Sequence, residues 1–273
     1  MFYLLRVAVF TLCAVTLPAL AQLQIEITRG VDNPTPIAVV PFGWSGPGAS
    51  PEDVARIIDS DLARSGQFSP VSRRDMLSYP TRGSDLYFRD WRAINSDYVL
   101  IGRYELAAAG NLKLSWQLFD STREQSVEEG VVTGKASEVR MLAHKIADEV
   151  YETLTGIPGA FATRLLYVSV TRNPSGKDFY RLTLADSDGA RPIVLLESRE
   201  PILGPSWSPD GQEVAYVSFE TSRPAIYRQN LRTGAREQLT NYKVLNNSPV
   251  FSPDGNSMAM VLRPNEHRNT KPE

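Results

Sequence analysis

A serine between glycines lies near the start of the chain, and this arrangement can support nucleophilic catalysis. In Gly43-Trp44-Ser45-Gly46, however, Pro47 stands where the nucleophile elbow of serine hydrolases has its last glycine. The overlapping loop 46–48 lacks the Gly-Lys-Ser/Thr of a phosphate-binding loop, and a dinucleotide fingerprint would need glycine in place of Pro51. We therefore predict a Gly/Pro loop through Gly48 without catalytic or phosphate-binding function.

Two other groups have the residue types of metal ligands. Asp186-Ser187-Asp188-Gly189 has the spacing that begins a calcium loop, but the rest of an EF-hand is absent and a hairpin turn is expected. His144 lies beside the apolar face of an expected helix, and no second ligand follows at metal-site spacing, so we expect it on the helix surface. We predict no catalytic residue, no metal and no cofactor, and a function in binding.

The charge balance excludes one class of partner. The formal net charge of the 273 residues is −2, and the chain has no cluster of Lys and Arg. Because phosphate contacts need concentrated positive charge, we do not expect nucleic acid as a partner.

Residues 1–21 have the pattern of a cleavable signal peptide. Arg6 supplies the positive charge, residues 7–17 form an apolar run too short to span a bilayer, and Ala19-Leu20-Ala21 is a small-x-small cleavage signal. Cys13 is the one cysteine and lies inside this segment, so the mature protein has no disulfide and must be stabilised by packing. We expect export to the periplasm.

The segment 22–33 alternates apolar and polar residues before a Pro-rich joint. Leu23, Ile25 and Ile27 alternate with polar neighbours, which is typical of a half-buried strand, and the pattern ends at Gly30. Periodicity alone favours an ordinary edge strand, while a terminal strand of this kind can also lend its backbone to another chain.

Residues 34–157 are expected to form an α/β (α+β) domain with a mixed sheet and two helices. The first helix is expected to start with Ser50 as N-cap, Pro51 at the first position and Asp53 as capping-box acid. The second is expected to start at Ser137 and to end at Gly156, before a hinge at 156–160. The apolar face of the first contains Val54, Ile57, Ile58 and Leu62, and that of the second contains Val139, Leu142, Ala143, Ile146, Val150 and Leu154. Strands are expected at 37–42, 98–101, 112–118 and 127–133, the last three as an antiparallel meander, with a short helix around Trp91 and Ile94.

Residues 158–262 contain a repeat. Pro205-Ser206-Trp207-Ser208-Pro209-Asp210-Gly211 returns 44 residues later as Pro249-Val250-Phe251-Ser252-Pro253-Asp254-Gly255. Ser-Pro-Asp-Gly suits a tight turn, and an aromatic strand before it with an apolar strand after it makes a β-hairpin at the period of a propeller blade. We predict an incomplete β-propeller of two blades and part of a third, starting near Leu165.

The repeat is lost at the end of the sequence. A third blade should repeat the apolar pair Ile226-Tyr227 at Thr270-Lys271, and residues 263–273 form a polar tail without apolar residues. Truncation, a frameshift or an early end of the sequence would each explain the loss, and we expect a poorly stabilised C-terminal half because open blade edges lack partners.

The paired turns, together with residues 154–161 (Leu-Thr-Gly-Ile-Pro-Gly-Ala-Phe) and residues 39–48 (Val-Val-Pro-Phe-Gly-Trp-Ser-Gly-Pro-Gly), resemble the TolB family of the Tol-Pal system. The resemblance extends from residue 22 to about residue 262. It implies a monomeric periplasmic protein that links TolA of the inner-membrane complex to the outer-membrane lipoprotein Pal, supporting outer-membrane integrity and constriction during cell division, with other lipoproteins or porins as further partners.

The same resemblance implies two binding surfaces. The TolA-binding arm would contain Gln22, Leu23, Gln24, Ile25, Glu26, Ile27, Thr28, Arg29, Gly30, Val31 and Asp32. The Pal-binding face of the propeller would contain Pro201, Ile202, Leu203, Leu245, Asn246, Asn247 and Ser248. Leu245 departs from the family, in which a polar residue is common at this position. With blades missing, we expect Pal affinity to be lost or much reduced while the TolA contact survives.

A propeller-gated serine peptidase of the prolyl-oligopeptidase type is the alternative. Its propeller has the same turn, but its catalytic domain would have to lie beyond residue 273 and supply GxSxG, Asp and His. Such enzymes do not carry an α/β domain like residues 22–155, which disfavours this interpretation.

Overall fold

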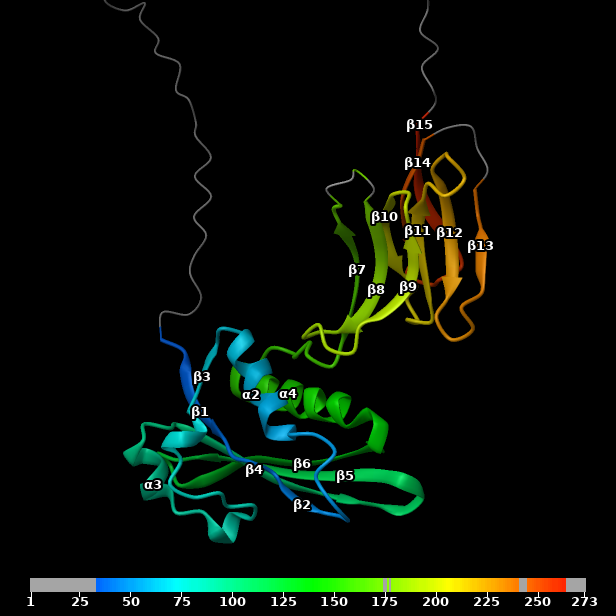
Figure 1. Ribbon diagram of the computed structural model, residues 1–273. Coiled ribbons are helices and arrows are strands. Elements are labelled where there is room, and N and C mark those ends of the chain that lie inside the picture. Colours follow the sequence, from blue (N-terminus) through cyan, green and yellow to red (C-terminus); the bar gives the residue numbers. More distant parts are fainter. Residues whose placement is uncertain (1–32, 174–175, 177, 241–244, 264–273) are drawn as a thin grey trace, which may run out of the picture. The chain divides into compact units, whose positions relative to one another are not determined.

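The computed structural model describes residues 33–173, 176, 178–240 and 245–263 (Figure 1). The expected signal peptide 1–21, arm residues 22–32 and polar tail residues 264–273 lie outside the described residues. Among the helices that the structure describes, none is long and apolar enough to cross a membrane.

A six-stranded mixed sheet forms the first part of the described chain. Its order is β3-β1-β4-β5-β6, and β2 pairs separately with β4. The strands are β1 (Thr35–Val39), β2 (Gly43–Ser45), β3 (Phe68–Pro70), β4 (Tyr98–Leu106), β5 (Asn111–Asp120) and β6 (Gln125–Lys135). The pairs β1–β3, β1–β4 and β2–β4 are parallel, whereas β4–β5–β6 is the expected antiparallel meander. The short strand β2 lies within the segment where we expected a Gly/Pro loop, and β3 was not among the expected strands.

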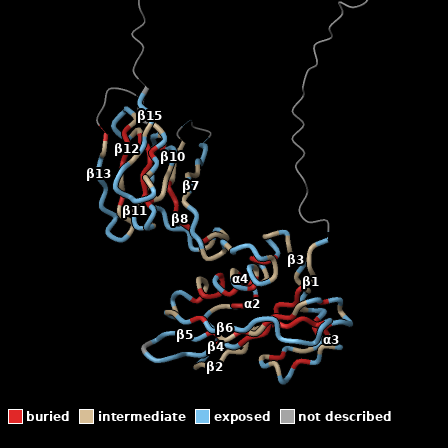
Figure 2. The backbone as a smooth tube through the Cα atoms, turned by 180° about the vertical axis from the view of Figure 1, so that it is seen from behind, coloured by how far each residue is buried: buried red, intermediate tan, exposed pale blue. Residues whose placement is uncertain are grey.

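Two helices cover one face of this sheet, as expected. They are α2 (Val54–Arg64) and α4 (Val139–Thr155), and their apolar faces share one core with the sheet (Figures 1 and 2). Ile58, Leu62, Leu114 and Ile146 in this core are 0% exposed. On the opposite face a second cluster forms around Trp91 of the short helix α3 (Phe88–Ala93). Four single 3-10 turns complete this region: η1 (Arg73–Asp75), η2 (Gly83–Asp85), η3 (Ala108–Gly110) and η4 (Ala136–Glu138).

Both predicted helix starts are wrong by a few residues. The N-cap of α2 is Asp53, whose Oδ1 accepts a hydrogen bond from the Arg56 N–H at 3.1 Å, and Ser50 and Pro51 precede the helix. Asp53 takes this place because Arg73 also binds both its oxygens, at 2.6 and 2.8 Å, and this pairing holds the pKa of Asp53 below its ordinary value. Ser137 lies inside η4 and does not cap α4.

The C-terminal end of α4 follows the prediction. Gly156 has φ 72°, and its N–H donates to the Glu152 carbonyl at 2.7 Å. This left-handed conformation closes the helix at little cost only for glycine or asparagine.

The second part of the described chain consists of antiparallel sheets. The first contains β7 (Arg164–Thr171), β8 (Phe179–Asp186) and β9 (Ile193–Ser198). The second contains β10 (Ile202–Trp207), β11 (Glu213–Ser218), β12 (Ala225–Asn230) and β13 (Arg236–Gln238), and the third contains β14 (Leu245–Phe251) and β15 (Met258–Arg263). A core that includes Leu182, Ile202, Val214 and Tyr227 packs the first two sheets. The expected incomplete propeller of two blades and part of a third is confirmed.

The two Ser-Pro-Asp-Gly turns have the same hydrogen bonds. Gly211 donates to the Ser208 carbonyl and Gly255 to the Ser252 carbonyl, each at 2.9 Å. A Cβ built on Gly255 would lie 3.7 Å from Cδ of Pro209, so the turns are neighbours in space. The sequence repeat therefore corresponds to adjacent sheets.

Candidate functional site

The inner strands β10 and β14 carry the residues expected to face a partner. Each strand has an irregularity at the same repeat position, between Leu203 and Ser206 in β10 and between Asn247 and Val250 in β14. Gly204 (φ 55°) and Ser248 (φ 51°) lie at these irregularities. A Cβ on Gly204 would be 3.8 Å from the Ser248 Cα, so the two bulges lie side by side. Repeated bulges aim neighbouring side chains in the same way in each blade.

The residues of the expected Pal-binding face differ in solvent exposure. Ile202 is 1% exposed and belongs to the propeller core, so it positions the strand, whereas Leu203 is 43% exposed. Pro201 and Asn247 are half-buried and Ser248 is exposed. Leu245 and Asn246 begin β14. Within the described residues, Leu203 and Ser248 are therefore the most accessible of this set.

Ser45 does not lie in a nucleophile elbow. It ends strand β2 and pairs with Glu105 of β4. An elbow requires a sharp turn from a strand into a helix, which a residue in parallel pairing does not make.

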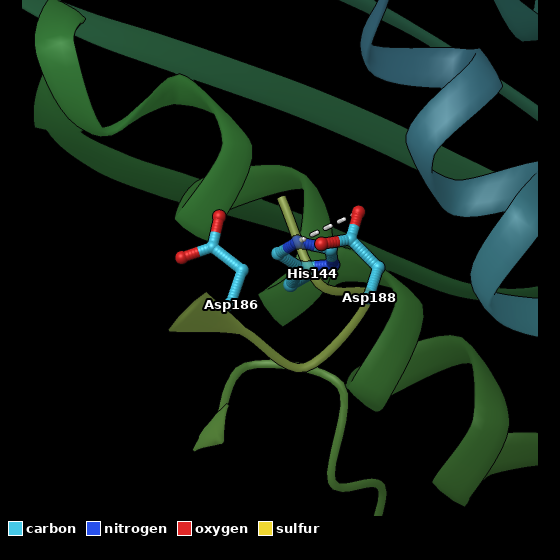
Figure 3. A group of neighbouring side chains, drawn as sticks. All are labelled: His144, Asp186 and Asp188. Atoms are coloured by element: carbon cyan, nitrogen blue, oxygen red, sulfur yellow. Dashed lines mark ion pairs between the residues drawn. The ribbon is translucent and has the colours of Figure 1, made fainter. Parts of the chain in front are cut away.

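The prediction that His144 lies on a helix surface is wrong. Its side chain is 0% exposed, and Nδ1 lies 2.5 Å from Oδ2 of Asp61, which is also 0% exposed. On the other side of the ring, Nε2 lies 3.9 Å from Oδ2 of Asp188 (Figure 3). Among the residues that the structure describes, Nε2 has no hydrogen-bond partner. His144 thus lies between a carboxylate of α2 and one of the β8–β9 turn.

The Asp186–Gly189 segment forms the expected turn, in which Gly189 donates to the Asp186 carbonyl at 2.9 Å. Its carboxylates do more than shape the turn, because both bind arginine. Arg191 contacts Asp186 through Nε at 2.8 Å and Nη2 at 3.0 Å, and Arg140 of α4 donates from Nη2 to Oδ2 of Asp188. Burial acts to raise the pKa of Asp188, but the backbone hydrogen bond from Ala190 and the charge of Arg140 hold it below its ordinary value.

His144, Asp186 and Asp188 are close enough to share a cation, since one ligand atom from each lies within 4.8 Å of the others. The residues nevertheless fit a metal ion poorly. Arg191 binds both oxygens of Asp186. Arg140 donates a hydrogen bond to Oδ2 of Asp188, and its Nε lies 3.6 Å from Oδ2 of Asp186. A divalent cation would have to displace two guanidinium groups that already neutralise these carboxylates.

The sequence contained one sign of this cluster. Arg140 and His144 are four residues apart on α4, so they share a helix face. Local sequence patterns could not predict their partners. Asp61 contacts His144 from 83 positions away in the sequence, and Asp188 contacts Arg140 from 48 positions away.

Comparison with known proteins agrees with this architecture. A family model described as the TolB amino-terminal domain matches residues 23–127, and one described as the TolB beta propeller domain matches residues 151–270. The chain belongs to the TolB family. The match over the amino-terminal domain does not favour the peptidase alternative, which offered no explanation for that domain.

Several members of the TolB family are similar over most of this chain. The Tol-Pal system protein TolB of Pseudomonas fluorescens is 46% identical over 247 residues, which are 90% of this chain and 57% of the relative. The protein of the same name from Pseudomonas putida is 47% identical with the same coverage. The crystal structure of TolB from Acinetobacter baumannii, 40% identical, matches with a TM-score of 0.74 over 88% of this chain and 58% of that chain. The chain therefore spans a little over half the length of these TolB relatives.

Proposed function

We propose that this chain is a periplasmic component of the Tol-Pal system that binds other proteins and catalyses no reaction. The relatives above carry the name Tol-Pal system protein TolB. The observation that carries the proposal is the pair of adjacent strands β10 and β14, whose bulges repeat at the same position and lie side by side. Bulges recur next to functional sites in β-sheets, where they re-aim a side chain.

The propeller surface is proposed to face Pal. Leu203 and Ser248, the most exposed residues of the expected Pal-binding face, would contact the partner. Ile202 would hold the strand in place from the propeller core. An exposed apolar side chain beside polar backbone and hydroxyl groups is typical of a protein-binding patch.

The arm 22–32 is proposed to bind TolA by adding its backbone to a partner sheet. Its alternating side chains would supply specificity, and the main chain would supply affinity. Together the two contacts would connect the inner-membrane complex with the outer membrane and support its integrity during constriction.

Deleting residues 22–32 is expected to abolish recovery of TolA in a pull-down with this chain. The arm would supply most of the hydrogen-bonding backbone, so its loss leaves no comparable surface. Thermal unfolding should show that the shortened chain still folds. Equal recovery of TolA by the two chains would remove the arm from the mechanism.

A photo-crosslinking amino acid at position 203 is expected to capture the periplasmic domain of Pal, because covalent capture detects even weak binding. Leu165 of β7 is the matched control, since it is also a leucine and is 45% exposed against 43% for Leu203. We expect clearly more product at position 203 than at position 165, because a photoreactive group captures the bound partner only where the two are in contact. Equal yields at the two positions would contradict the assignment of this face.

A further inference from the structure

We propose that His144 is a proton-dependent latch that joins α4 to the Asp186–Gly189 turn of the first propeller sheet. This inference goes beyond the proposed function and does not depend on it. It concerns the attachment of the propeller to the helices of the amino-terminal domain, whichever partners the chain binds.

The two ring nitrogens of His144 have different surroundings. Nδ1 bonds to Asp61 at 2.5 Å within the α2–α4 layer, whereas Nε2 faces Asp188 at 3.9 Å and has no hydrogen-bond partner in the described part of the chain. A neutral ring that donates from Nδ1 points its Nε2 lone pair at a carboxylate, which is repulsive. An imidazolium presents an N–H on each side. Protonation therefore changes the contact with the turn from repulsion to attraction, while the Asp61 contact is kept in both forms.

Other charges around the ring decide how much protonation of His144 strengthens the contact between α4 and the turn. Asp61 and Arg64 face it from α2, Arg140 from α4, and Asp186, Asp188 and Arg191 from β8 and the following turn; Glu52 lies 3.9 Å from Arg140. The three aspartates and three arginines balance, and Glu52 adds one negative charge. A protonated His144 restores neutrality, and Arg140 still holds Asp188 when the ring is neutral, so the latch loosens without being lost.

The contact between α4 and the Asp186–Gly189 turn is polar, which makes it responsive to charge, whereas Phe161 of the linker packs against the core of the amino-terminal domain. Among the described residues, the core of the amino-terminal domain and that of the propeller have no member in common. The linker between them also makes hydrogen bonds: Asp148 of α4 accepts from Phe161 N at 2.6 Å and from Ala162 N at 3.0 Å, and Ser187 donates to the Phe161 carbonyl at 2.5 Å. A small change in electrostatic free energy can therefore shift the equilibrium between attached and detached forms.

The test measures the distance between the two parts by paired spin labels on the full chain, with Cys13 replaced by serine. Cysteines replacing the exposed residues Arg89 and Arg232 carry the labels. Distance distributions are recorded at about pH 5 and about pH 8, on either side of ordinary histidine titration. We expect the ratio of detached to attached chains to be roughly three- to tenfold lower at the acidic pH, as for a partly exposed charge-assisted hydrogen bond.

Asp188→Asn is the decisive variant, because it keeps the shape of the turn and removes the charge that Nε2 faces. We expect it to abolish the difference between the two pH values. The matched control is Glu197→Gln, which neutralises an exposed propeller carboxylate paired with Arg181 and should leave the difference intact. Ionisation of His144, followed by NMR of its ring carbon, should occur over the same pH range as detachment.

Three results would overturn the latch. They are an unchanged distance distribution between the two pH values in the parent chain, an equal pH response in Asp188→Asn, and a His144 ring whose ionisation does not coincide with detachment. Far-UV circular dichroism checks that Asp188→Asn is folded. A folded variant that stays attached to the same extent at both pH values supports the latch. A folded variant that is detached at both pH values would show that the Arg140–Asp188 ion pair alone makes the attachment, and would overturn the latch as well.

Discussion

Asp61→Ala is expected to lower the free energy of unfolding of the amino-terminal domain by about 1–3 kcal/mol, the cost of leaving a buried hydrogen-bond donor without its acceptor. Asp61 and His144 are both 0% exposed, and Oδ1 of Asp61 also binds Arg64 at 2.8 Å. Alanine would leave the His144 Nδ1 without an acceptor in a site that water does not reach. Urea denaturation followed by tryptophan fluorescence measures the loss, since Trp91 and Trp116 are buried in this domain.

Asp59→Ala is the matched control for this prediction. Asp59 lies on the same helix but is half-buried, and burial raises the pKa of its carboxyl, so the charge is not stabilised there. We expect a change within about 0.5–1 kcal/mol, as for most substitutions outside a buried network. A similar decrease in the free energy of unfolding in both variants would mean that removing any carboxylate from helix α2 destabilises the domain. The Asp61–His144 pair would then make no particular contribution to stability.

Leu114→Ala is expected to cost about 2–5 kcal/mol of the same free energy. Leu114 is 0% exposed and lies on the face of β5 that α2 and α4 cover, in one core with Leu112 and Leu118. Removing its branched end leaves a cavity that the neighbouring strands and helices cannot close without moving. The measurement is the urea midpoint together with the slope, which should stay constant if only stability changes.

Leu106→Ala tests whether the effect comes from the core. Leu106 ends strand β4 and is 47% exposed, so the same substitution removes little buried surface there. We expect a loss within about 0.5 kcal/mol. Equal losses in the two variants would contradict the assignment of Leu114 to the centre of the core.

Much of the fold could be predicted from local patterns. The apolar faces of α2 and α4, the meander β4–β5–β6 and the glycine that ends α4 follow from helical and strand periodicity and from turn chemistry. The propeller followed from a repeat of 44 residues, because each blade needs the same turn and the same apolar strands. The starts of both helices were misplaced, because several capping residues lay close together and tertiary contacts selected among them.

The sequence by itself determined that this chain has an α/β domain followed by propeller blades, because each helix face, strand and tight turn is encoded by residues near one another. Only the tertiary structure decided what His144 does. Its partners come from helix α2 and from the β8–β9 turn, and local periodicity contains no information on which distant carboxylates will meet a helix. The side-by-side placement of Gly204 and Ser248 depends in the same way on how neighbouring sheets pack. Contacts between distant segments form only when the whole chain has buried its apolar surface, and these contacts form both the His144 cluster and the proposed Pal-binding face.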